Sequence, residues 1–207
     1  MLSEDVVREI DLLAHRTGTN RSSLINQILA EYVNLTTPEK RVNDIFKAID
    51  DLMSSSALVP FFMPNTATMS LKSSLEYKYR PTVKYEVELY RNAADFLGEI
   101  SVIFRTQSAS LISEMTDFFR LWKAVEDRHL APVLGSGAPR YALYEGKFVR
   151  TIALPRRSCT AEELAGAISD YIRFFDGAMK KYLSGREGGA GTETEYIDFL
   201  ENGNLLI

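Results

Sequence analysis

The chain has few of the residues on which metal-binding and disulfide-rich proteins depend. Among its 207 residues it has a single cysteine, Cys159, and only two histidines, His15 and His129. A single cysteine excludes an internal disulfide framework and fits a reducing compartment, so we expect a cytoplasmic protein. The two histidines fall in different predicted helices, which does not favour a shared metal site. We therefore expect no metal, no cofactor and no enzymatic activity.

Long apolar runs are also missing. The chain has no stretch of about eighteen apolar residues, and acidic residues stand near its N-terminus where a secretory signal would have an apolar core. Neither membrane insertion nor export is therefore expected. A content of 45% hydrophobic and 25% charged residues is ordinary for a globular chain. Its length suits one substantial core and a small second unit.

Two helices are predicted at the N-terminus. Ser3 suits a helix N-cap, and apolar residues recur at helical spacing from Val6 to Ala14. Gly18 can take the left-handed conformation that ends a helix, and Asn20 can cap the next one. The second helix carries a wide apolar face of six residues: Leu24, Ile25, Ile28, Leu29, Tyr32 and Val33. One short helix cannot cover this face, so we expect a second copy of the chain to cover it.

Residues 2–34 resemble the helix pair of the ribbon-helix-helix family (MetJ/Arc and CopG-like proteins), which are dimeric DNA-binding regulators. The resemblance lies in the turn Gly18-x-Asn20-Arg21-Ser22, which leads straight into the wide apolar helix. It implies a homodimer with the six apolar residues in its core. It also implies that Asn20, Arg21 and Ser22 contact DNA phosphates, because a helix N-terminus offers unpaired N–H groups and a positive dipole end. The alternative is that Asn20 and Ser22 act only as helix caps.

The base-reading part of that family is a short strand before the first helix, which pairs with its twin in the DNA major groove. Here only Met1 and Leu2 precede Ser3. Either such a strand lies upstream of Met1 or it has been lost, and the retained dimer-type face favours the first. The charge is less favourable, because residues 1–53 carry six basic and nine acidic residues, a net charge of −3. Free-standing nucleic-acid binders are usually basic.

These observations predict a dimeric DNA-binding protein, a transcriptional regulator whose C-terminal domain serves assembly or sensing. Its expected partners are DNA and a second copy of itself, with a further protein or a small ligand at the C-terminal domain, and no membrane. The alternative is an interaction protein, antitoxin-like or a plasmid accessory factor, that keeps the dimer without sequence-specific DNA reading.

The rest of the chain divides where its sequence pattern changes. A third helix is predicted over residues 38–53 and is grouped with the first two as a module over residues 1–53. Residues 54–70 contain serines and prolines and are expected to form a connector. Residues 71–184 form a larger domain. Residues 185–207 are expected to be a flexible glycine-rich linker with an acidic tail, which is more often disordered than docked.

The larger domain is predicted to be α+β. Alternating polar and apolar residues predict three antiparallel strands over 71–79, 83–89 and 100–104, with one solvated face. Two long helices, over 111–125 and 164–182, carry apolar stripes suited to the other face. A second hairpin joins residues 141–144 to 147–154. This order predicts an antiparallel sheet with helices on one side. Five tyrosines are expected to pack in the core: Tyr77, Tyr79, Tyr85, Tyr171 and Tyr182.

Two sets of charged residues lie in this domain. The solvated strand face is expected to form ion pairs across strands, among Lys72, Glu76, Lys78, Lys84, Glu86, Glu88, Glu99 and Arg105. A basic group surrounds the second hairpin: Arg140, Lys147, Arg150, Arg156 and Arg157. This group is interpreted as isolated surface charge. Contact with DNA backbone or with an anionic effector is the alternative.

Overall fold

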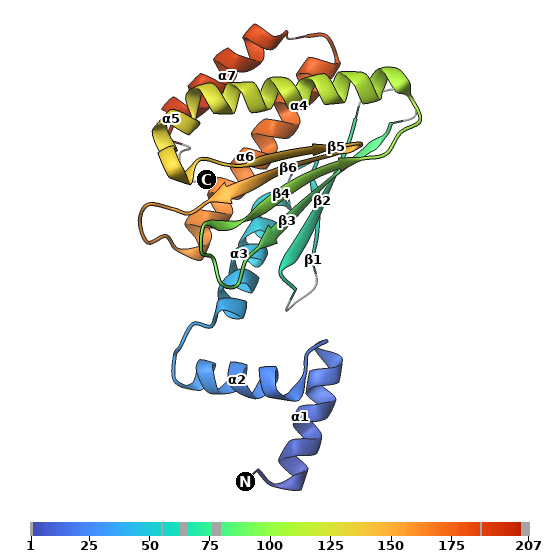
Figure 1. Ribbon diagram of the computed structural model, residues 1–207. Helices are drawn as coiled ribbons and strands as arrows, with labels where there is room; N and C mark the ends of the chain where they lie inside the picture. The colour runs from blue at the N-terminus through green and yellow to red at the C-terminus, as the bar shows by residue number, and fades with distance from the viewer. Residues whose placement is uncertain (1, 55, 63–65, 76–79, 187, 204–207) are drawn as a thin grey trace.

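The computed structural model describes residues 2–54, 56–62, 66–75, 80–186 and 188–203 (Figure 1). Three helices come first: α1 (Glu4–Arg16), α2 (Arg21–Tyr32) and α3 (Pro38–Met53). Four strands follow: β1 (Val59–Phe62), β2 (Thr68–Ser74), β3 (Thr82–Leu89) and β4 (Phe96–Phe104). The remaining elements are α4 (Ala109–His129), α5 (Ala131–Leu134), the 3-10 turn η1 (Gly135–Gly137), β5 (Tyr141–Tyr144), β6 (Lys147–Ala153), α6 (Ala161–Leu183) and α7 (Gly189–Glu201).

The strands form one antiparallel sheet of six strands in the order β1-β2-β3-β4-β6-β5. The predicted strands β2, β3 and β4 lie next to one another, and the predicted hairpin of β5 and β6 adds to them through β6. The helices that pack on the sheet lie on one side of it (Figure 1). The predicted α+β class, with an antiparallel sheet covered by helices, is therefore confirmed.

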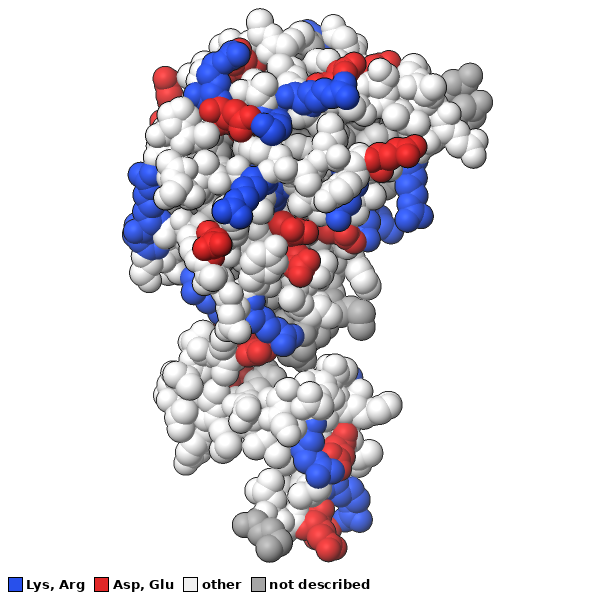
Figure 2. Space-filling model, in the orientation of Figure 1, with Lys and Arg blue, Asp and Glu red and all other residues white. Residues whose placement is uncertain are grey.

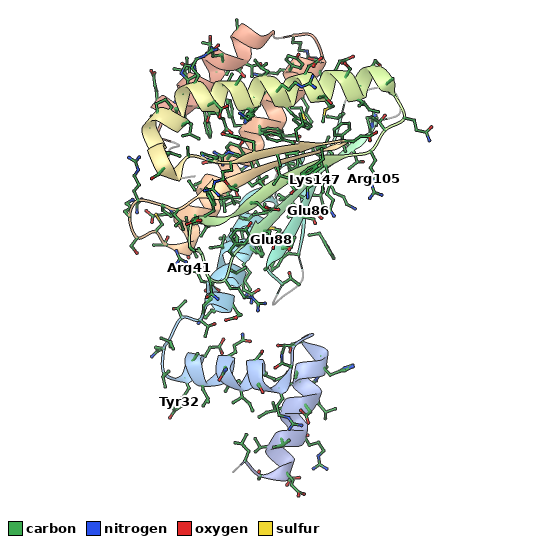
Figure 3. All side chains as sticks on the ribbon, in the orientation of Figure 1. Tyr32, Arg41, Glu86, Glu88, Arg105 and Lys147 are labelled. Atoms are coloured by element: carbon green, nitrogen blue, oxygen red, sulfur yellow. The ribbon has the colours of Figure 1, made fainter. Side chains whose placement is uncertain are left out.

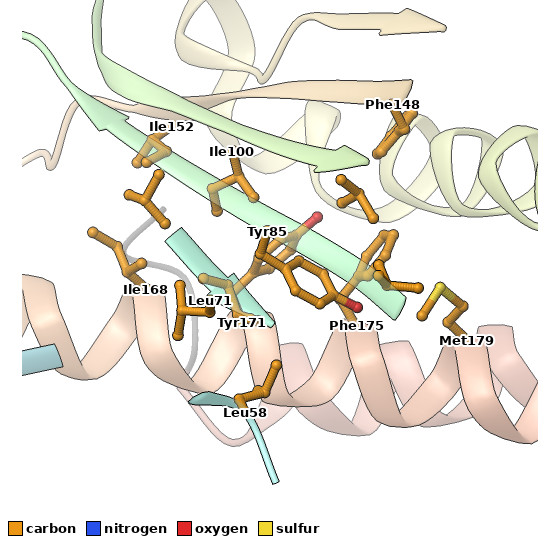
Figure 4. Packing of buried hydrophobic residues seen from close by; sticks show 14 of the residues in the cluster. Leu58, Leu71, Tyr85, Ile100, Phe148, Ile152, Ile168, Tyr171, Phe175 and Met179 are labelled. Carbon is orange, nitrogen blue, oxygen red and sulfur yellow. The ribbon is translucent and has the colours of Figure 1, made fainter. Parts of the chain in front are cut away.

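The core lies between the sheet and its helices. Tyr85 and Ile100 point from the sheet toward α6, and Phe148 stacks on Phe175 of α6 with ring centroids 6.1 Å apart (Figure 4). Helix α4 packs on the same side, because its Phe119 ring stacks on Phe148 at 5.1 Å. Such interdigitated aromatic rings bury large apolar areas and dominate the energetics of a core.

The tyrosine predictions can be followed where the chain is described. Tyr85 and Tyr171 are buried in the core and Tyr182 packs against it, as predicted. Four residues named in the sequence predictions lie outside the described residues: Glu76, Tyr77, Lys78 and Tyr79.

Helix α3 forms where the sequence predicts it, but its partner differs from the expected one. The sequence pattern groups it with the N-terminal helices, whereas its buried residues belong to the core of the sheet. The ring centroids of Phe46 and of Phe62 in β1 lie 6.0 Å apart. The apolar stripe of a helix shows that it needs a cover and does not show which one. We therefore treat α3 to α7 as one sheet unit and α1 with α2 as the hairpin.

The segment expected to be a connector contributes to the sheet. Residues 59–62 form the edge strand β1, and β2 already begins at Thr68. Pro60 lies in β1, where an edge position tolerates a residue that cannot donate a hydrogen bond. Pro60 is therefore compatible with an edge strand, whereas Ser54 and Ser56 donate to backbone carbonyls at the end of α3.

The C-terminal tail is expected from its sequence to be a flexible linker with a disordered end, and this is wrong for residues 189–201. They form helix α7, whose Tyr196 is buried against Trp122 with ring centroids 5.4 Å apart. The ring of Phe199 stacks on Phe174 of α6 at 4.3 Å. Burial of these aromatic rings outweighs the low helix propensity of the glycines at the start of α7.

The hairpin stands apart from the sheet unit and packs mainly on itself (Figure 1). Helices α1 and α2 are joined at Gly18, which takes a left-handed φ of 65°. Among the described helices, none is both long and apolar enough to cross a membrane.

Candidate nucleic-acid interface

The turn between α1 and α2 has the predicted local structure. Gly18 adopts the positive φ that ends α1, and Asn20 caps α2 by accepting a hydrogen bond from the backbone N–H of Ser23 at 2.9 Å. The cap satisfies one of the free N–H groups of the helix and leaves the others at an exposed end. Arg21 and Ser22 are exposed in the first turn of α2. The three residues predicted to contact phosphate therefore share one exposed helix terminus.

Arg21 already has an anionic partner in this structure. Its guanidinium makes a two-pronged contact with the Asp11 carboxylate of α1, with Nε 2.6 Å from Oδ1 and Nη2 bonded to Oδ2. The hydrogen bond from Arg21 lowers the pKa of Asp11, and the same pairing raises the pKa of Arg21. Both side chains are about half exposed, so water weakens the pair. A phosphate at this turn would compete with Asp11 for the guanidinium.

The apolar face of α2 is largely uncovered in a single chain. Leu24 is buried and Ile25 is half-buried. The other four predicted core residues are exposed: Ile28 (43%), Leu29 (56%), Tyr32 (87%) and Val33 (65%). Figure 3 shows Tyr32 pointing away from the sheet unit. A contiguous exposed apolar patch is one of the features by which interaction surfaces differ from the rest of a protein surface.

A polar hollow of about 380 Å³ lies between the turn of the hairpin and the sheet unit. On one side it is lined by the start of α2, including Asn20 and Ser23, and on the other by Glu39 and Arg91. The distance from Nη1 of Arg91 to Oε1 of Glu39 is 3.6 Å. The predicted phosphate site therefore adjoins a cation of the sheet unit.

The basic group around the second hairpin does not form one patch. Arg157 pairs with Glu163, with Nη2 2.7 Å from Oε1, and Arg140 lies over the ring of Phe96 at 4.8 Å. Arg156 donates to the backbone carbonyl of Val133. Figure 2 shows basic and acidic side chains interspersed on the visible face. The interpretation of isolated charges fits these contacts, with one exception.

That exception is Arg150, which the sequence interpretation places at the surface and which is 1% exposed. Its Nε lies 3.0 Å from Oε2 of Glu126, which is itself fully buried, and its guanidinium lies 4.3 Å above the Tyr171 ring. Burial lowers the pKa of Arg150, but the Glu126 carboxylate and the surrounding tyrosines outweigh that effect and raise it. A buried charge needs such a partner, because water no longer solvates it.

The buried pair is enclosed by aromatic groups, one of which comes from α7. The Tyr196 hydroxyl donates to Oε1 of Glu126 at 3.1 Å, and Trp122 Nε1 donates to the Tyr171 hydroxyl at 3.0 Å. Burial, together with the Glu126 charge, raises the pKa of Tyr196. These hydrogen bonds join side chains of α4, α6, α7 and β6 within the core.

A second buried polar network links α6 to the sheet. Asp176 accepts from the Tyr85 hydroxyl at 2.9 Å and from Ser73 Oγ at 3.1 Å. Lys180 donates to Asp176 at 2.6 Å and to Ser73 at 2.7 Å. The network therefore joins Ser73 of β2 and Tyr85 of β3 to α6.

Neither a metal site nor a relative indicates a function. Within the described ranges, no group of three or more His, Cys, Asp or Glu side chains is placed to hold a metal ion. Comparison with protein-family models, with curated proteins and with solved structures found no match to this chain.

Proposed function

We propose that the protein is a cytoplasmic, dimeric DNA-binding regulator whose α1–α2 hairpin pairs with that of a second copy. The observation that carries the proposal is the exposure of Ile28, Leu29, Tyr32 and Val33 along one helix. Full burial of an exposed aliphatic side chain contributes about 1.5–3 kcal/mol, and the partly covered Ile28, Leu29 and Val33 would contribute a fraction of this in proportion to the area that is still exposed. Two α2 helices, each covering the face of the other, remove both patches at once.

The DNA contact in this proposal is the start of α2. Two α2 N-termini in a dimer present backbone N–H groups and Arg21 to the phosphates, which positions the protein on a duplex without reading its sequence. The acidic partner Asp11 then sets the strength of this contact, since Arg21 must exchange a carboxylate for a phosphate.

The dimer is tested by sedimentation of the full chain. Leu29→Asp should remove the hairpin interface and so reduce the size of the assembly at micromolar concentration, because it forces a charge into a dry interface. The control is Val133→Asp on α5, where an apolar residue of similar exposure (44%) lies outside the hairpin. A monomeric unmodified chain, or a Leu29→Asp chain of unchanged size, would overturn the proposed dimer.

DNA contact is tested with a pair of opposite substitutions. Arg21→Ala should weaken duplex binding for all sequences and make the slope of log K against log salt shallower by about 0.9 for each phosphate that Arg21 neutralises. Asp11→Ala should strengthen binding, because it removes the competing carboxylate and one negative charge. The proposal fails if both variants bind duplex DNA like the unmodified chain, or if no chain binds at low salt.

The second candidate function is an interaction protein that keeps the dimer without DNA reading. The Arg21–Asp11 pair favours it, because the proposed phosphate ligand is already engaged within the chain. A stable hairpin dimer without duplex affinity at low salt, in the Asp11→Ala variant as well, would decide for this function.

A further inference from the structure

The sheet has a second face on which none of the described helices packs. Side chains alternate along its strands, so the residues between the buried ones point to this face. On β3 these are Lys84, Glu86 and Glu88, and on β2 they include Lys72. Figure 3 shows Glu86, Glu88, Arg105 and Lys147 on the side of the sheet away from α4 and α6. We call this surface the open face.

The charges of the open face are sorted by sign, contrary to the predicted ion pairs across strands. Lys72 of β2 lies directly opposite Lys84 of β3. Toward the other end of β3, Glu88 lies directly opposite Glu99 of β4. Like charges directly opposite each other destabilise an antiparallel pair. Both pairs are therefore unfavourable in a chain that stands alone.

The sorting extends across the sheet. In the row of Lys72 and Lys84, the next strands contribute Ile103 and then Lys147, which pair in register. The row is thus basic across β2, β3 and β6. The ion pair on this face that the structure shows runs along β3, where Lys84 Nζ lies 2.5 Å from Glu86 Oε1. The open face has a basic end and an acidic end.

We propose that the open face binds the open face of a second copy of this chain. A nucleic acid would neutralise the lysines but meet the Glu88–Glu99 pair with repulsion, and a basic partner would have the reverse defect. A second copy has both signs on one surface of matching size. Complementary potentials of this kind fix the orientation of an interface and disfavour the wrong partner.

The charge pattern also selects the symmetry axis. In a face-to-face dimer the two-fold axis lies between the sheets. An axis parallel to the strands would place each basic end over the partner's basic end. An axis running across the strands reverses the strand direction and lays the basic end over the acidic end. It also lays each strand over the same strand of the partner.

That arrangement brings together the sheet edges, which carry exposed apolar residues. On β1, Val59 and Phe61 point to the open face, where Val59 lies opposite Lys72, and they are 65% and 68% exposed. On β5, Tyr144 is 62% exposed and lies opposite Lys147. With the axis across the strands, β1 meets β1 and β5 meets β5. Phe61 lies in the row of Glu86, midway between the basic and acidic ends, so it lies nearest its own copy. Val59 and Tyr144 lie in the basic row and are carried over the acidic end of the partner's β1 and β5.

The size of the open face is sufficient for an interface. Six strands about 4.8 Å apart and about 20 Å long make a plane of roughly 600 Å², and the corrugated side chains expose more. Stable interfaces bury about 800 Å² of accessible surface per partner. This inference does not require the hairpin to bind DNA. Together, the two interfaces would link hairpin dimers through their sheet units.

The test uses charge reversal in the full chain carrying Leu29→Asp, followed by sedimentation. This chain should still dimerise through its sheets. Adding Lys72→Glu with Lys84→Glu, or Glu88→Lys with Glu99→Lys, should raise the dimer dissociation constant roughly tenfold or more. Each reversal replaces one like-charge pair across strands by another, but the lysine reversal also removes the Lys84–Glu86 ion pair and the glutamate reversal removes the acceptor of the Tyr90 hydroxyl. Circular dichroism of each variant therefore checks that the fold is kept.

Restoration is the decisive measurement. Mixing the two reversed chains, or combining all four substitutions in one chain, should recover association, because opposite charges again face each other. Arg120→Glu with Lys123→Glu on α4 makes the same change of net charge away from the open face and should leave association unchanged. A Leu29→Asp chain that is monomeric at every concentration, or reversals without effect, would overturn the inference. The experiment also distinguishes failure of this inference from failure of the proposed hairpin dimer. If only the hairpin dimer were wrong, Leu29→Asp would leave the size of the assembly unchanged, and the charge reversals would still reduce it.

Discussion

The hairpin and the sheet unit are built from similar amphipathic helices and reach different degrees of burial. In the hairpin the buried apolar residues are Ala14, Leu24 and Ala30, while large side chains stay exposed. In the sheet unit Phe118 and Trp122 are fully buried. The helices of the hairpin have 13 and 12 residues, near the length below which isolated helices are marginal in water.

In the proposed dimer, this contrast in burial means that the hairpin takes part of its stability from a second copy of the chain. The sheet unit has an internal partner for each apolar stripe, because the sheet and three long helices cover one another. The hairpin lacks such a partner within the described chain. Its stability should therefore depend on protein concentration more strongly than that of the sheet unit, whose core is complete within one chain. Substitutions in the two units should separate these behaviours.

The largest expected effect is the loss of the buried charge pair in the sheet unit. Glu126→Ala leaves Arg150 buried without its carboxylate, which should lower the free energy of unfolding by about 3–5 kcal/mol. Asp127→Ala, at the next position on the exposed side of α4, is the control and should change it by less than about 0.5 kcal/mol. Denaturant unfolding measures both. Equal effects would show that the buried pair contributes nothing particular.

A backbone contact in the sheet gives the next largest effect. A Cβ on Gly98 would lie 2.0 Å from the backbone oxygen of Glu88, which cannot move without disturbing the pairing of β3 and β4. Gly98→Ala should therefore destabilise the sheet unit by about 2 kcal/mol or more. Gly166→Ala in α6 meets no neighbour within 4 Å and should stabilise by up to about 1 kcal/mol. Thermal unfolding of the two variants should shift in opposite directions, and a shared direction would contradict this account.

A pair of helix caps compares the two units directly. Asn20 accepts from Ser23 N–H at 2.9 Å in the hairpin, and Thr37 accepts from Lys40 N–H at 3.1 Å at the start of α3. Replacement by Ala should cost about 1 kcal/mol at either site. Asn20→Ala should then increase hydrogen exchange in the hairpin most strongly in dilute protein. Thr37→Ala should affect α3 with a weaker dependence on concentration, because α3 packs on the core of its own chain. Equal concentration dependence at the two caps would contradict the proposed difference between the units.

Local features could be predicted from the sequence better than pairings. The roles of Gly18 and Asn20 are predictable because turn and cap chemistry is local. The contact of Arg21 with Asp11 depends on the angle between two helices, which no short pattern encodes. The surface on which α3 packs is also not predictable from its sequence, because the apolar stripe of α3 could pack on any apolar surface.

Two features of the sheet unit do have a signal in the sequence. Along β6, Arg150 lies two residues from both Phe148 and Ile152, which point into the core. Because side chains alternate between the two faces of a strand, Arg150 is expected to point into the core as well. Glu126 follows Trp122 by four residues on the same helical face. The docking of Tyr196 has no such signal, because the glycines before it indicate a linker and its partner lies 70 residues away.

The smallest expected effect concerns pH and the start of α6. Arg157 and the backbone N–H of Thr160 hydrogen-bond the Glu163 carboxylate and lower its pKa from 4.5 to about 2. A carboxylate with a lowered pKa stabilises the fold above the pKa of the unfolded chain and loses this contribution as the pH falls toward 2. Glu163→Gln should therefore slightly destabilise the sheet unit at neutral pH, and its difference from the unmodified chain should shrink below pH 4.5.

Arg157→Gln should move the titration of Glu163, followed by carboxyl NMR, back toward its ordinary range, because Arg157 is the largest cause of the shift. A titration midpoint that Arg157→Gln leaves unchanged would assign the effect to the backbone cap alone. Because the site belongs to the sheet unit, neither substitution should alter the dependence of the hairpin on concentration.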